Sequence, residues 1–272
     1  NNLVDNLNNG SVSGLIMVGV NPAYTLPNAD KFISGLKKTK FSICFSMKND
    51  ESAIHSKWVA AMPHFLESWG DNEMKYGRFS LTQPTIRPLF DTKQFQDCLL
   101  NWVGSDMTFY DYLKNNWKTN ILNQSSWNQA LHDGFYDSKE KYNLKNQKYD
   151  VKKYFTNLLN YRSKGDYEIV LYTKTGLGDG QQANNPWLQE FPDPITRVSW
   201  DNYLTVSKND AQKLGLKNFN VANGALDSNY ALVSIEDRSL KVPIIIQPGQ
   251  ANGSVGLSFG YGKKEAVKKE MQ

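Results

Sequence analysis

The chain has 272 residues, of which 40% are hydrophobic and 21% are charged, and its formal net charge is +4. This composition is typical of a folded protein with one large or two medium-sized domains, and it excludes a disordered or fibrous chain. The charge is small and dispersed, so we expect no nucleic-acid partner. No apolar run approaches the roughly 20 residues that cross a bilayer, so we expect no direct membrane insertion. Because the chain begins with Asn1 instead of methionine, we expect it to be a piece of a longer protein.

The first part of the chain predicts alternating strands and helices. Residues 15–20 form a continuous apolar run, as expected of a parallel strand covered on both faces, and Asn21-Pro22 ends it. A helix that Asn28 can cap follows, and residues 41–45 predict a second strand, which completes a right-handed βαβ unit. The same alternation continues with a helix over residues 51–56 and a strand over residues 58–62.

The middle of the chain is less regular and then becomes helical. Glycines and prolines punctuate residues 68–90, which predicts turns and a short hairpin around Gly77. Apolar residues at helical spacing predict helices over residues 95–102, 109–117, 127–132 and 151–161. The charged and polar residues 137–150 predict an exposed connection.

The last part of the chain is rich in strands. Strand patterns cover residues 168–173, 197–206, 230–236, 240–246 and 255–259. A short helix is predicted between Ser207, which can cap it, and Gly215, which can end it. Several strands, one short helix and many glycine turns predict a barrel. We therefore expect an α/β domain over residues 1–165 and a β domain over residues 166–272.

Few side chains in the sequence are typical of catalysis or metal binding. The three histidines lie in no recognisable nucleophile motif, and each is expected to be structural, so no catalytic residue is predicted. Cys44 and Cys98 belong to no CxxC pair, which argues against a zinc or iron–sulfur site within this chain. The two cysteines are expected to be either two buried free thiols or one disulfide.

Two asparagine–proline pairs and a glycine-rich loop are the candidates for ligand binding. Asn21-Pro22 follows the carboxyl end of a predicted parallel strand, where open α/β sheets bind ligands. Asn185, with Pro186 and the ring of Trp187, can bind the polar edge of a heterocycle. The loop at residues 176–180 lacks the spacing of a phosphate-binding loop, so a plain flexible loop is its simpler interpretation. Asparagine–proline is also a common start of a turn.

Taken together, these segments resemble the molybdopterin oxidoreductase superfamily of the dimethyl-sulfoxide-reductase type. Residues 15–23 resemble that family's strand and Asn-Pro loop, and residues 49–67 its "E-T-A…A-D-V-V-L-P…E" stretch, with Lys57-Trp58 in place of the usual Ala-Asp. Residues 185–190 and 206–215 resemble its C-terminal dinucleotide-binding domain. The resemblance implies an incomplete Rossmann-like parallel sheet domain followed by a double-psi β-barrel domain.

A narrower resemblance concerns residues 178–203 and 246–262, which look like the large iron–sulfur subunit of bacterial alternative complex III. That resemblance implies a quinol-oxidising respiratory complex at the periplasmic face of the inner membrane. It further implies that iron–sulfur clusters lie elsewhere in the full-length protein and that no molybdenum cofactor is bound here. This segment would then be a non-catalytic scaffold, whose partners are other subunits and the cluster-bearing domain of its own chain.

Two alternatives remain open at the level of sequence. In the first, the segment belongs to an active oxidoreductase and binds a molybdopterin guanine dinucleotide. The contacts would come from Asn21 and Pro22 in the first domain, and from Gly178, Gly180, Asn185 and Trp187 in the second. In the other alternative, the many Trp and Tyr side chains serve a binding module for a small ligand or carbohydrate.

Overall fold

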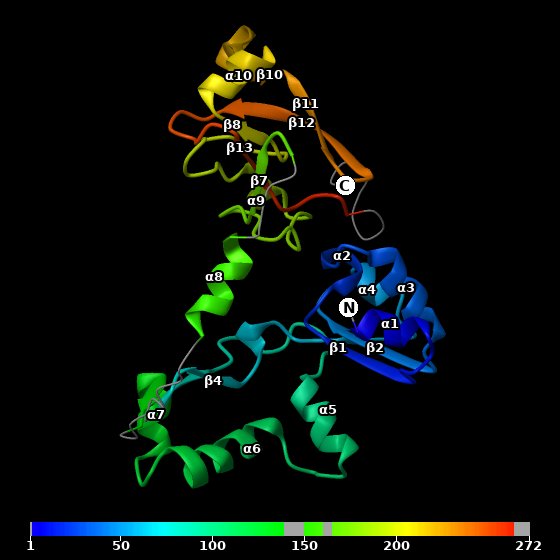
Figure 1. The fold of residues 1–272 in the computed structure, drawn as a ribbon. Coiled ribbons are helices and arrows are strands. Elements are labelled where there is room, and N and C mark those ends of the chain that lie inside the picture. Colours follow the sequence, from blue (N-terminus) through cyan, green and yellow to red (C-terminus); the bar gives the residue numbers. More distant parts are fainter. Residues whose placement is uncertain (1, 139–149, 160–164, 264–272) are drawn as a thin grey trace. The chain divides into compact units, whose positions relative to one another are not determined.

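The computed structural model describes residues 2–138, 150–159 and 165–263 (Figure 1). The chain has a mixed α/β fold and divides into two compact units, Asn1–Lys148 and Tyr149–Gln272. The sequence places the domain boundary near Gly165, whereas this division lies before helix α8 (Val151–Leu159). Most of the predicted connection, residues 139–149, lies outside the described residues. None of the described helices is long and apolar enough to span a membrane.

The first unit begins with a small parallel sheet of order β1-β2-β3. Its strands are β1 (Gly14–Val18), β2 (Phe41–Ser46) and β3 (Trp58–Ala61), which confirms the three strands predicted from the apolar runs. Four helices accompany the sheet along the chain: α1 (Asn2–Asn8), α2 (Pro22–Thr25), α3 (Ala29–Lys38) and α4 (Glu51–Ile54).

One face of this sheet is closed by α1 and α3. Their apolar side chains, Leu7, Phe32 and Leu36, pack with Met17 and Cys44 of the sheet into a core cluster. The two helices approach each other closely at Gly35, where an added Cβ would lie 2.7 Å from the Cβ of Leu7. A larger residue at position 35 would therefore push the helices apart.

The rest of the first unit combines an antiparallel sheet with helices. The sheet has the order β4-β5-β6 and consists of β4 (Gly70–Lys75), β5 (Arg78–Thr82) and β6 (Phe135–Asp137). The predicted hairpin is confirmed, and Gly77 takes the left-handed conformation that its turn needs, at φ 75°. The helices are η1 (Phe65–Glu67), α5 (Phe95–Trp102), α6 (Phe109–Asn116), the π-helical η2 (Trp117–Ile121) and α7 (Trp127–Asp133).

An aromatic core joins these helices to the antiparallel sheet. Trp117 is fully buried, and its ring packs edge-on against Trp127 at 5.8 Å and near Phe79 of β5 at 6.2 Å. The indole Nε1 of Trp117 donates a hydrogen bond of 2.8 Å to Asp71 Oδ2 on β4. One side chain therefore contributes both packing and a polar link between two segments.

The second unit is built on a mixed five-stranded sheet of order β11-β12-β8-β13-β7. Its strands are β7 (Glu168–Tyr172), β8 (Leu204–Val206), β11 (Tyr230–Ile235), β12 (Arg238–Ile246) and β13 (Ser254–Ser258). A separate pair joins β9 (Asn218–Asn220) to β10 (Leu226–Ser228). The helices that follow α8 are α9 (Pro186–Glu190), α10 (Lys208–Leu214) and η3 (Ala222–Gly224). The double-psi barrel stays a prediction.

The long strand predicted over residues 197–206 is wrong except for its last three residues. Arg197, Trp200 and Asp201 have positive φ values of 65°, 61° and 48°, which interrupt an extended backbone. Only Leu204–Val206 joins the sheet, as β8.

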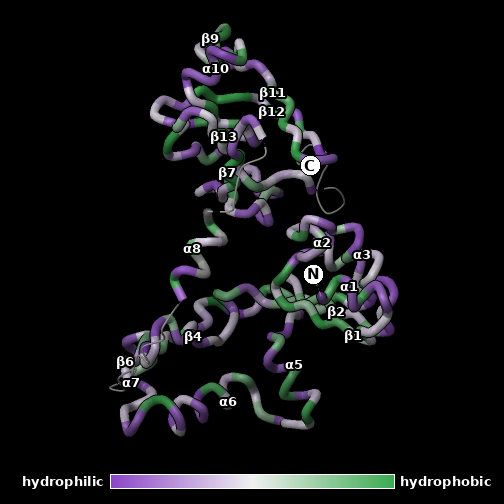
Figure 2. Tube along the Cα trace, viewed as in Figure 1, coloured by the Kyte–Doolittle hydropathy of each residue, from purple (hydrophilic) through white to green (hydrophobic). Residues whose placement is uncertain are grey.

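The two faces of the five-stranded sheet have different neighbours. One face gathers the apolar side chains of a core cluster, including Leu204, Val206 and Ile244, against Ala211 of α10. Their neighbours along the strands point the other way, and Thr205 lies beside Gly256 on the opposite face. Hydrophobic stretches alternate with hydrophilic loops along this unit (Figure 2).

The predicted cap and stop of α10 are both confirmed. Ser207 Oγ accepts a hydrogen bond of 3.1 Å from Asp210 N, and Gly215 ends the helix in the left-handed conformation. The buried Asp210 carboxylate in turn accepts hydrogen bonds from Ser207 Oγ at 2.7 Å and from Gly253 N at 2.8 Å. These two bonds, together with Lys213, hold the pKa of Asp210 below its ordinary value.

This network makes the stability of the second unit depend on pH. Because the pKa of Asp210 is lower in the folded state than in the unfolded state, its contribution is present above about pH 4 and is lost as the pH falls through the folded pKa. We expect the stability difference between the native protein and Asp210→Asn to be largest near pH 7 and to shrink below pH 4. Urea unfolding of both proteins at pH 7, 4 and 3 checks this. A difference that is constant with pH would contradict it.

Candidate functional sites

The first candidate site lies where β1 ends, at Asn21 and Pro22. Asn21 is 3% exposed, and its Nδ2 donates a hydrogen bond of 2.7 Å to Glu51 Oε2. Its Oδ1 accepts hydrogen bonds from Ser52 N at 3.1 Å and from Ser52 Oγ at 2.7 Å. Pro22 opens α2, and Ser52 Oγ also accepts from Ala23 N at 3.0 Å. The Asn21 amide therefore ties α2 to α4 inside the chain.

The second candidate site is the glycine-rich loop after β7. Gly178 and Gly180 both have positive φ, at 57° and 91°, so this loop needs glycine at these positions. Gly178 N donates to Lys174 O at 2.8 Å, and Gly180 N donates to Leu177 O at 2.9 Å. Both backbone N–H groups are thus engaged within the loop.

The third candidate site is the start of α9. Asn185 is the N-cap residue, its Oδ1 accepts a hydrogen bond of 3.1 Å from Trp187 N, and Pro186 takes the first helical position. Asn185 is exposed, and the Trp187 side chain is 82% exposed. The amide of Asn185 and the ring of Trp187 are therefore accessible on the surface of the second unit.

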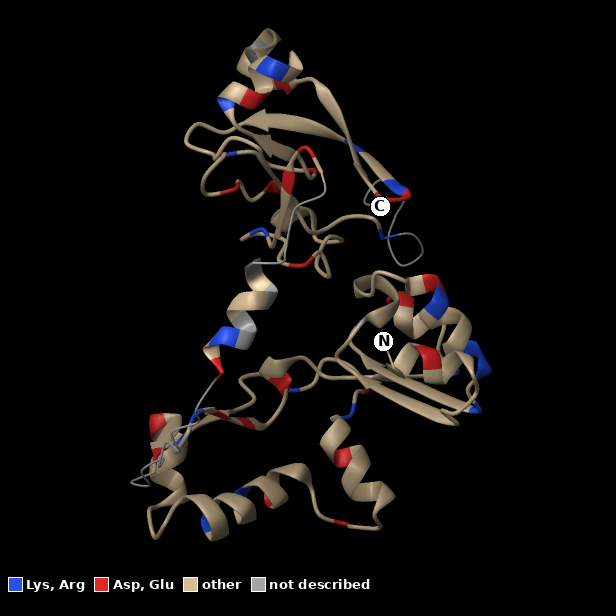
Figure 3. Cartoon of the chain, in the orientation of Figure 1, with Lys and Arg blue, Asp and Glu red and all other residues tan. Residues whose placement is uncertain are grey.

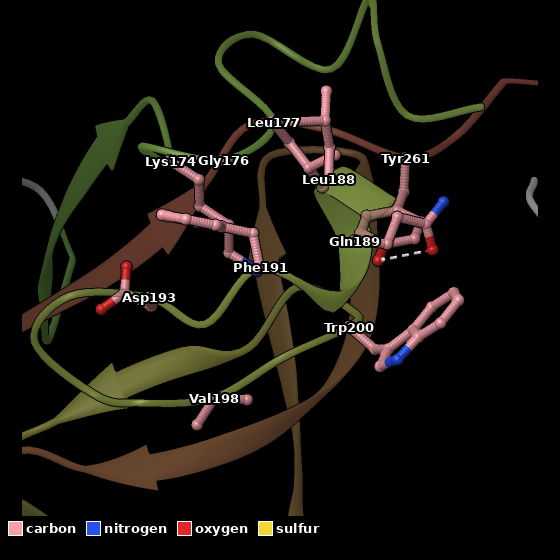
Figure 4. Close-up of a pocket in the computed structure, with 10 residues that line it drawn as sticks. All are labelled: Lys174, Gly176, Leu177, Leu188, Gln189, Phe191, Asp193, Val198, Trp200 and Tyr261. Atoms are coloured by element: carbon pink, nitrogen blue, oxygen red, sulfur yellow. Dashed lines mark hydrogen bonds between the residues drawn. The ribbon is translucent and has the colours of Figure 1, made fainter. Parts of the chain in front are cut away.

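A small pocket lies between the glycine-rich loop, α9 and the segment that leads to β8 (Figure 4). Gln189 of α9 is buried in its wall and accepts a hydrogen bond of 3.3 Å from the Tyr261 hydroxyl. Lys174 donates to Asp201 O, and its Nζ lies 4.6 Å from the centre of the Tyr203 ring. Burial lowers the pKa of Lys174, although Asp193 and Asp201 oppose this shift.

A larger cavity of about 290 Å³ lies on the face of the five-stranded sheet that carries Thr205 and Gly256. Asp193 borders it, and its Oδ1 accepts hydrogen bonds from Ile195 N at 2.9 Å and Thr196 N at 2.8 Å. The hydroxyls of Thr196 and Tyr203 lie 2.5 Å apart, and burial raises the pKa of Tyr203 to about 12. Gln250 also lines the cavity, and its buried Oε1 accepts no hydrogen bond from any described residue. The cavity offers hydrogen-bonding groups, without a paired nucleophile and base among its described lining residues.

Gly256 forms part of this cavity and is expected not to tolerate a side chain. An added Cβ would lie 2.5 Å from Thr205 Oγ1 and 3.3 Å from Tyr172 Cε1. We expect Gly256→Ala to lower the free energy of unfolding by about 1–3 kcal/mol through overpacking. Hydrogen exchange of peptides from the second unit measures this loss. The double variant Gly256→Ala with Thr205→Ala removes the nearest atom and should recover part of it. A double variant with the added losses of both single variants would contradict the steric explanation.

His64 and His132 make local contacts, and both cysteines are free thiols. His64 caps η1, since its Nδ1 accepts a hydrogen bond of 3.3 Å from Leu66 N, and His132 lies 2.9 Å from Asp133. Cys44 and Cys98 are both free; Cys44 is buried, which raises its pKa to about 11, and Cys98 is partly buried. Within the part of the chain that the structure describes, no three His, Cys, Asp or Glu side chains gather as metal ligands.

Comparisons with known proteins bear on the family of the chain. No family model matches it. Over 110 residues it is 33% identical to the menaquinone reductase, molybdopterin-binding-like subunit, of Nitratidesulfovibrio vulgaris strain Hildenborough, a match that covers 37% of this chain and 16% of that protein. The chain is a distant homologue of that subunit.

A solved structure extends this finding to the fold. Acetylene hydratase from Pelobacter acetylenicus matches 95% of this chain with a TM-score of 0.62 and 14% identity, and the match covers 39% of the hydratase chain. The first comparison supports the resemblance to molybdopterin oxidoreductase-like proteins, and the second shows that the chain shares its fold with the hydratase. The chain spans only a minor part of each of these two proteins.

The hydrogen bonds permit a test of whether the predicted residues suit a pterin dinucleotide. The polar side-chain atoms of Asn21 bond to Glu51 and Ser52, and the N–H groups of Gly178 and Gly180 bond to loop carbonyls. In this arrangement these groups do not present donors for phosphates or for a base. The assignment of all six residues to a dinucleotide stays a prediction. Lys174, Gln189, Asp193 and Tyr203 converge without any local motif that could have marked them in the sequence.

Proposed function

We propose that this chain is a scaffold segment of a molybdopterin oxidoreductase-like iron–sulfur subunit, within a respiratory complex that oxidises quinol. Electron transfer belongs to iron–sulfur clusters outside the segment, and the segment itself binds no pterin. The relative's own name supports a quinone-linked complex, because it describes a molybdopterin-binding-like subunit of a menaquinone reductase. A reductase reduces the quinone, so the direction of quinol oxidation rests on the narrower resemblance alone. The narrower resemblance to alternative complex III supports the same setting.

One observation supports the scaffold role above the others. The Asn21 amide and the N–H groups of Gly178 and Gly180, which a cofactor-binding segment would direct at its ligand, make hydrogen bonds within the chain. Lys57 points the same way. It occupies a position where the resembled family prefers a small residue, and its Nζ donates to Thr39 O at 2.7 Å and Lys40 O at 3.0 Å. The Lys57 side chain therefore binds the backbone that connects α3 to β2, at a position that could face a cofactor in the resembled family.

The partners that follow from this proposal are the cluster-bearing part of the same polypeptide and neighbouring subunits of the complex. The relative's name, which describes a subunit, supports such partners. We place the complex at the periplasmic face of the bacterial inner membrane.

Pterin and metal analysis of the native protein tests the proposal. The affinity-tagged protein, purified from its own organism, should contain iron but far less than one molybdenum or tungsten and one pterin per chain. Elemental analysis gives the metals, and fluorescence after oxidative denaturation gives the pterin. A pterin enzyme purified from the same cells serves as the positive control. One pterin per chain would overturn the scaffold role.

That outcome would favour the second candidate, a cofactor-binding part of an active oxidoreductase. The exposed amide of Asn185 beside the 82% exposed ring of Trp187 is the observation that favours it. Asn185→Leu should then reduce the pterin content several-fold. Under the scaffold proposal the same variant only removes a helix cap, which costs about 1 kcal/mol.

A further inference from the structure

The tripeptide Asn-Gly-Ser occurs twice in the chain, at residues 9–11 after α1 and at residues 252–254 at the start of β13. An asparagine before a glycine is chemically labile, because the glycine nitrogen, with no side chain beside it, can attack the asparagine side-chain carbonyl. Asn9 and Asn252 are both exposed within their own units, so exposure does not distinguish them. The two sites differ in what holds the attacking nitrogen and the carbonyl.

At the first tripeptide, the attacking nitrogen is weakly held. Gly10 lies just after α1 in the left-handed conformation, at φ 80°. Its N–H donates to Leu7 O at 3.3 Å, which is long for a hydrogen bond between backbone groups. A neutral carbonyl at this distance does little to keep the proton on the Gly10 nitrogen.

The carbonyl of the same tripeptide carries two hydrogen-bond donors. Asn9 Oδ1 accepts from Ser11 N at 3.0 Å and from Ser11 Oγ at 2.5 Å. Attack by Gly10 N on Asn9 Cγ places negative charge on this oxygen, and donors already aimed at it stabilise that charge, as an oxyanion hole does. The first tripeptide therefore combines a loosely held nucleophile with an activated carbonyl.

At the second tripeptide, a carboxylate holds the attacking nitrogen. Gly253 N donates at 2.8 Å to Oδ2 of Asp210, a buried residue of α10, the helix on which Figure 3 shows both acidic and basic residues. A hydrogen bond to a charged acceptor is stronger than one to a neutral carbonyl, and the negative charge opposes loss of the proton. Asn252 Oδ1 lies 3.0 Å from Ser207 Oγ, whose hydroxyl also donates to Asp210 at 2.7 Å. The nucleophile is therefore suppressed at Gly253.

We propose that Asn9 is a site of spontaneous deamidation and that the fold protects Asn252 from the same reaction. Gly10 N forms a bond to Asn9 Cγ, and its proton passes through water to the Asn9 amide nitrogen, which leaves as ammonia. Water then opens the resulting succinimide at either carbonyl, so residue 9 becomes aspartate or isoaspartate. Isoaspartate carries the backbone through Cβ and thus disturbs the hydrogen bonds that end α1. This inference does not depend on the proposed function.

Peptide mapping of the complete protein, purified from its own host, tests the proposal. The protein is aged at neutral pH, and the deamidated fractions of Asn9 and Asn252 are followed by mass spectrometry. We expect Asn9 to deamidate roughly tenfold faster or more, the factor that one hydrogen bond to a charged group represents. An intact Asn9, similar rates at both sites or a faster Asn252 would overturn the proposal.

The same protein in concentrated urea is the matched control. Because the two tripeptides are identical, their rates should become similar once the chain is unfolded. If the native ratio persisted in urea, the difference would come from flanking sequence instead of the fold, and the protection of Asn252 would be refuted.

Variants at each tripeptide test the two physical causes separately. Ser11→Ala removes one donor to Asn9 Oδ1 and should slow deamidation of Asn9 roughly fivefold, whereas Ser11→Thr keeps the hydroxyl and should retain the rate. Asp210→Asn removes the charge at Gly253 N and should speed deamidation of Asn252 several-fold.

Ser207→Ala is the control for a general loss of stability in the second unit. It removes the cap of α10 but keeps the Asp210 carboxylate at Gly253 N, so Asn252 should stay protected. Equal rates at Asn252 in the Asp210→Asn and Ser207→Ala proteins would contradict protection by the carboxylate. A native rate at Asn9 in Ser11→Ala would contradict activation by the hydroxyl.

Discussion

Trp117→Ala is expected to destabilise the first unit by about 3–5 kcal/mol, one of the two largest effects that the structure predicts. The side chain is fully buried and packs with Trp127 and Phe79, so its removal leaves a large cavity that rigid aromatic neighbours fill poorly. It also removes the indole N–H that Asp71 accepts at 2.8 Å. Hydrogen exchange of peptides from α6, α7 and β4 measures the loss in the complete protein.

Two further variants separate packing from hydrogen bonding at this position. Trp117→Phe keeps an aromatic ring but removes the donor to Asp71, and we expect a smaller loss of about 1–3 kcal/mol. Trp187→Ala removes a tryptophan that is 82% exposed, and it should change stability by less than about 0.5 kcal/mol. Similar losses for Trp117→Ala and Trp187→Ala would show that Trp117 is not a core residue.

Local signals in the sequence predict the parts of the fold that depend on neighbouring residues. The apolar runs at β1 and β2 predict the parallel strands correctly, although Ile16 and Phe41 are exposed on one side of them. Ser207 and Gly215 mark the ends of α10 through their own hydrogen bonds and backbone angles. The segment before β8 is mispredicted because its residues alternate in polarity as a strand does. Its backbone turns instead, because Arg197, Trp200 and Asp201 have positive φ. The Arg197 and Trp200 amides donate hydrogen bonds to Asp193 O and Gln189 O, and not to a neighbouring strand.

The candidate sites depend on contacts that are distant in the sequence. Asn21 is predicted correctly as the end of a strand, but its partner Glu51 lies 30 residues away, and no spacing rule connects the two. The same holds for Lys174 and Tyr203, which meet in space from different segments. The sequence alone therefore does not tell whether an asparagine contacts a ligand or joins two segments of the chain by hydrogen bonds.

Asn21→Leu is expected to destabilise the first unit by about 2–4 kcal/mol, because one buried side chain satisfies several groups. The variant removes the donor to Glu51 Oε2 and the acceptor of both the Ser52 N–H and the Ser52 hydroxyl. Glu51 and Ser52 are themselves buried, so water cannot readily replace these bonds. Hydrogen exchange of peptides from α2 and α4 measures the loss, and Asn120→Leu, at an exposed asparagine, is the matched control.

The same variant distinguishes a structural asparagine from a cofactor contact. If Asn21 holds α2 to α4, the exchange protection of both helices falls whether or not the protein has ever contained a pterin. If its main role is to contact a nucleotide, Asn21→Leu lowers the pterin content while the protection of α4 in pterin-free protein stays unchanged. Because the three hydrogen bonds use the side-chain donor and acceptor within the chain, we expect the first result. A stable variant that has lost bound pterin would reverse the assignment of Asn21 and, with it, the strongest support for the scaffold role.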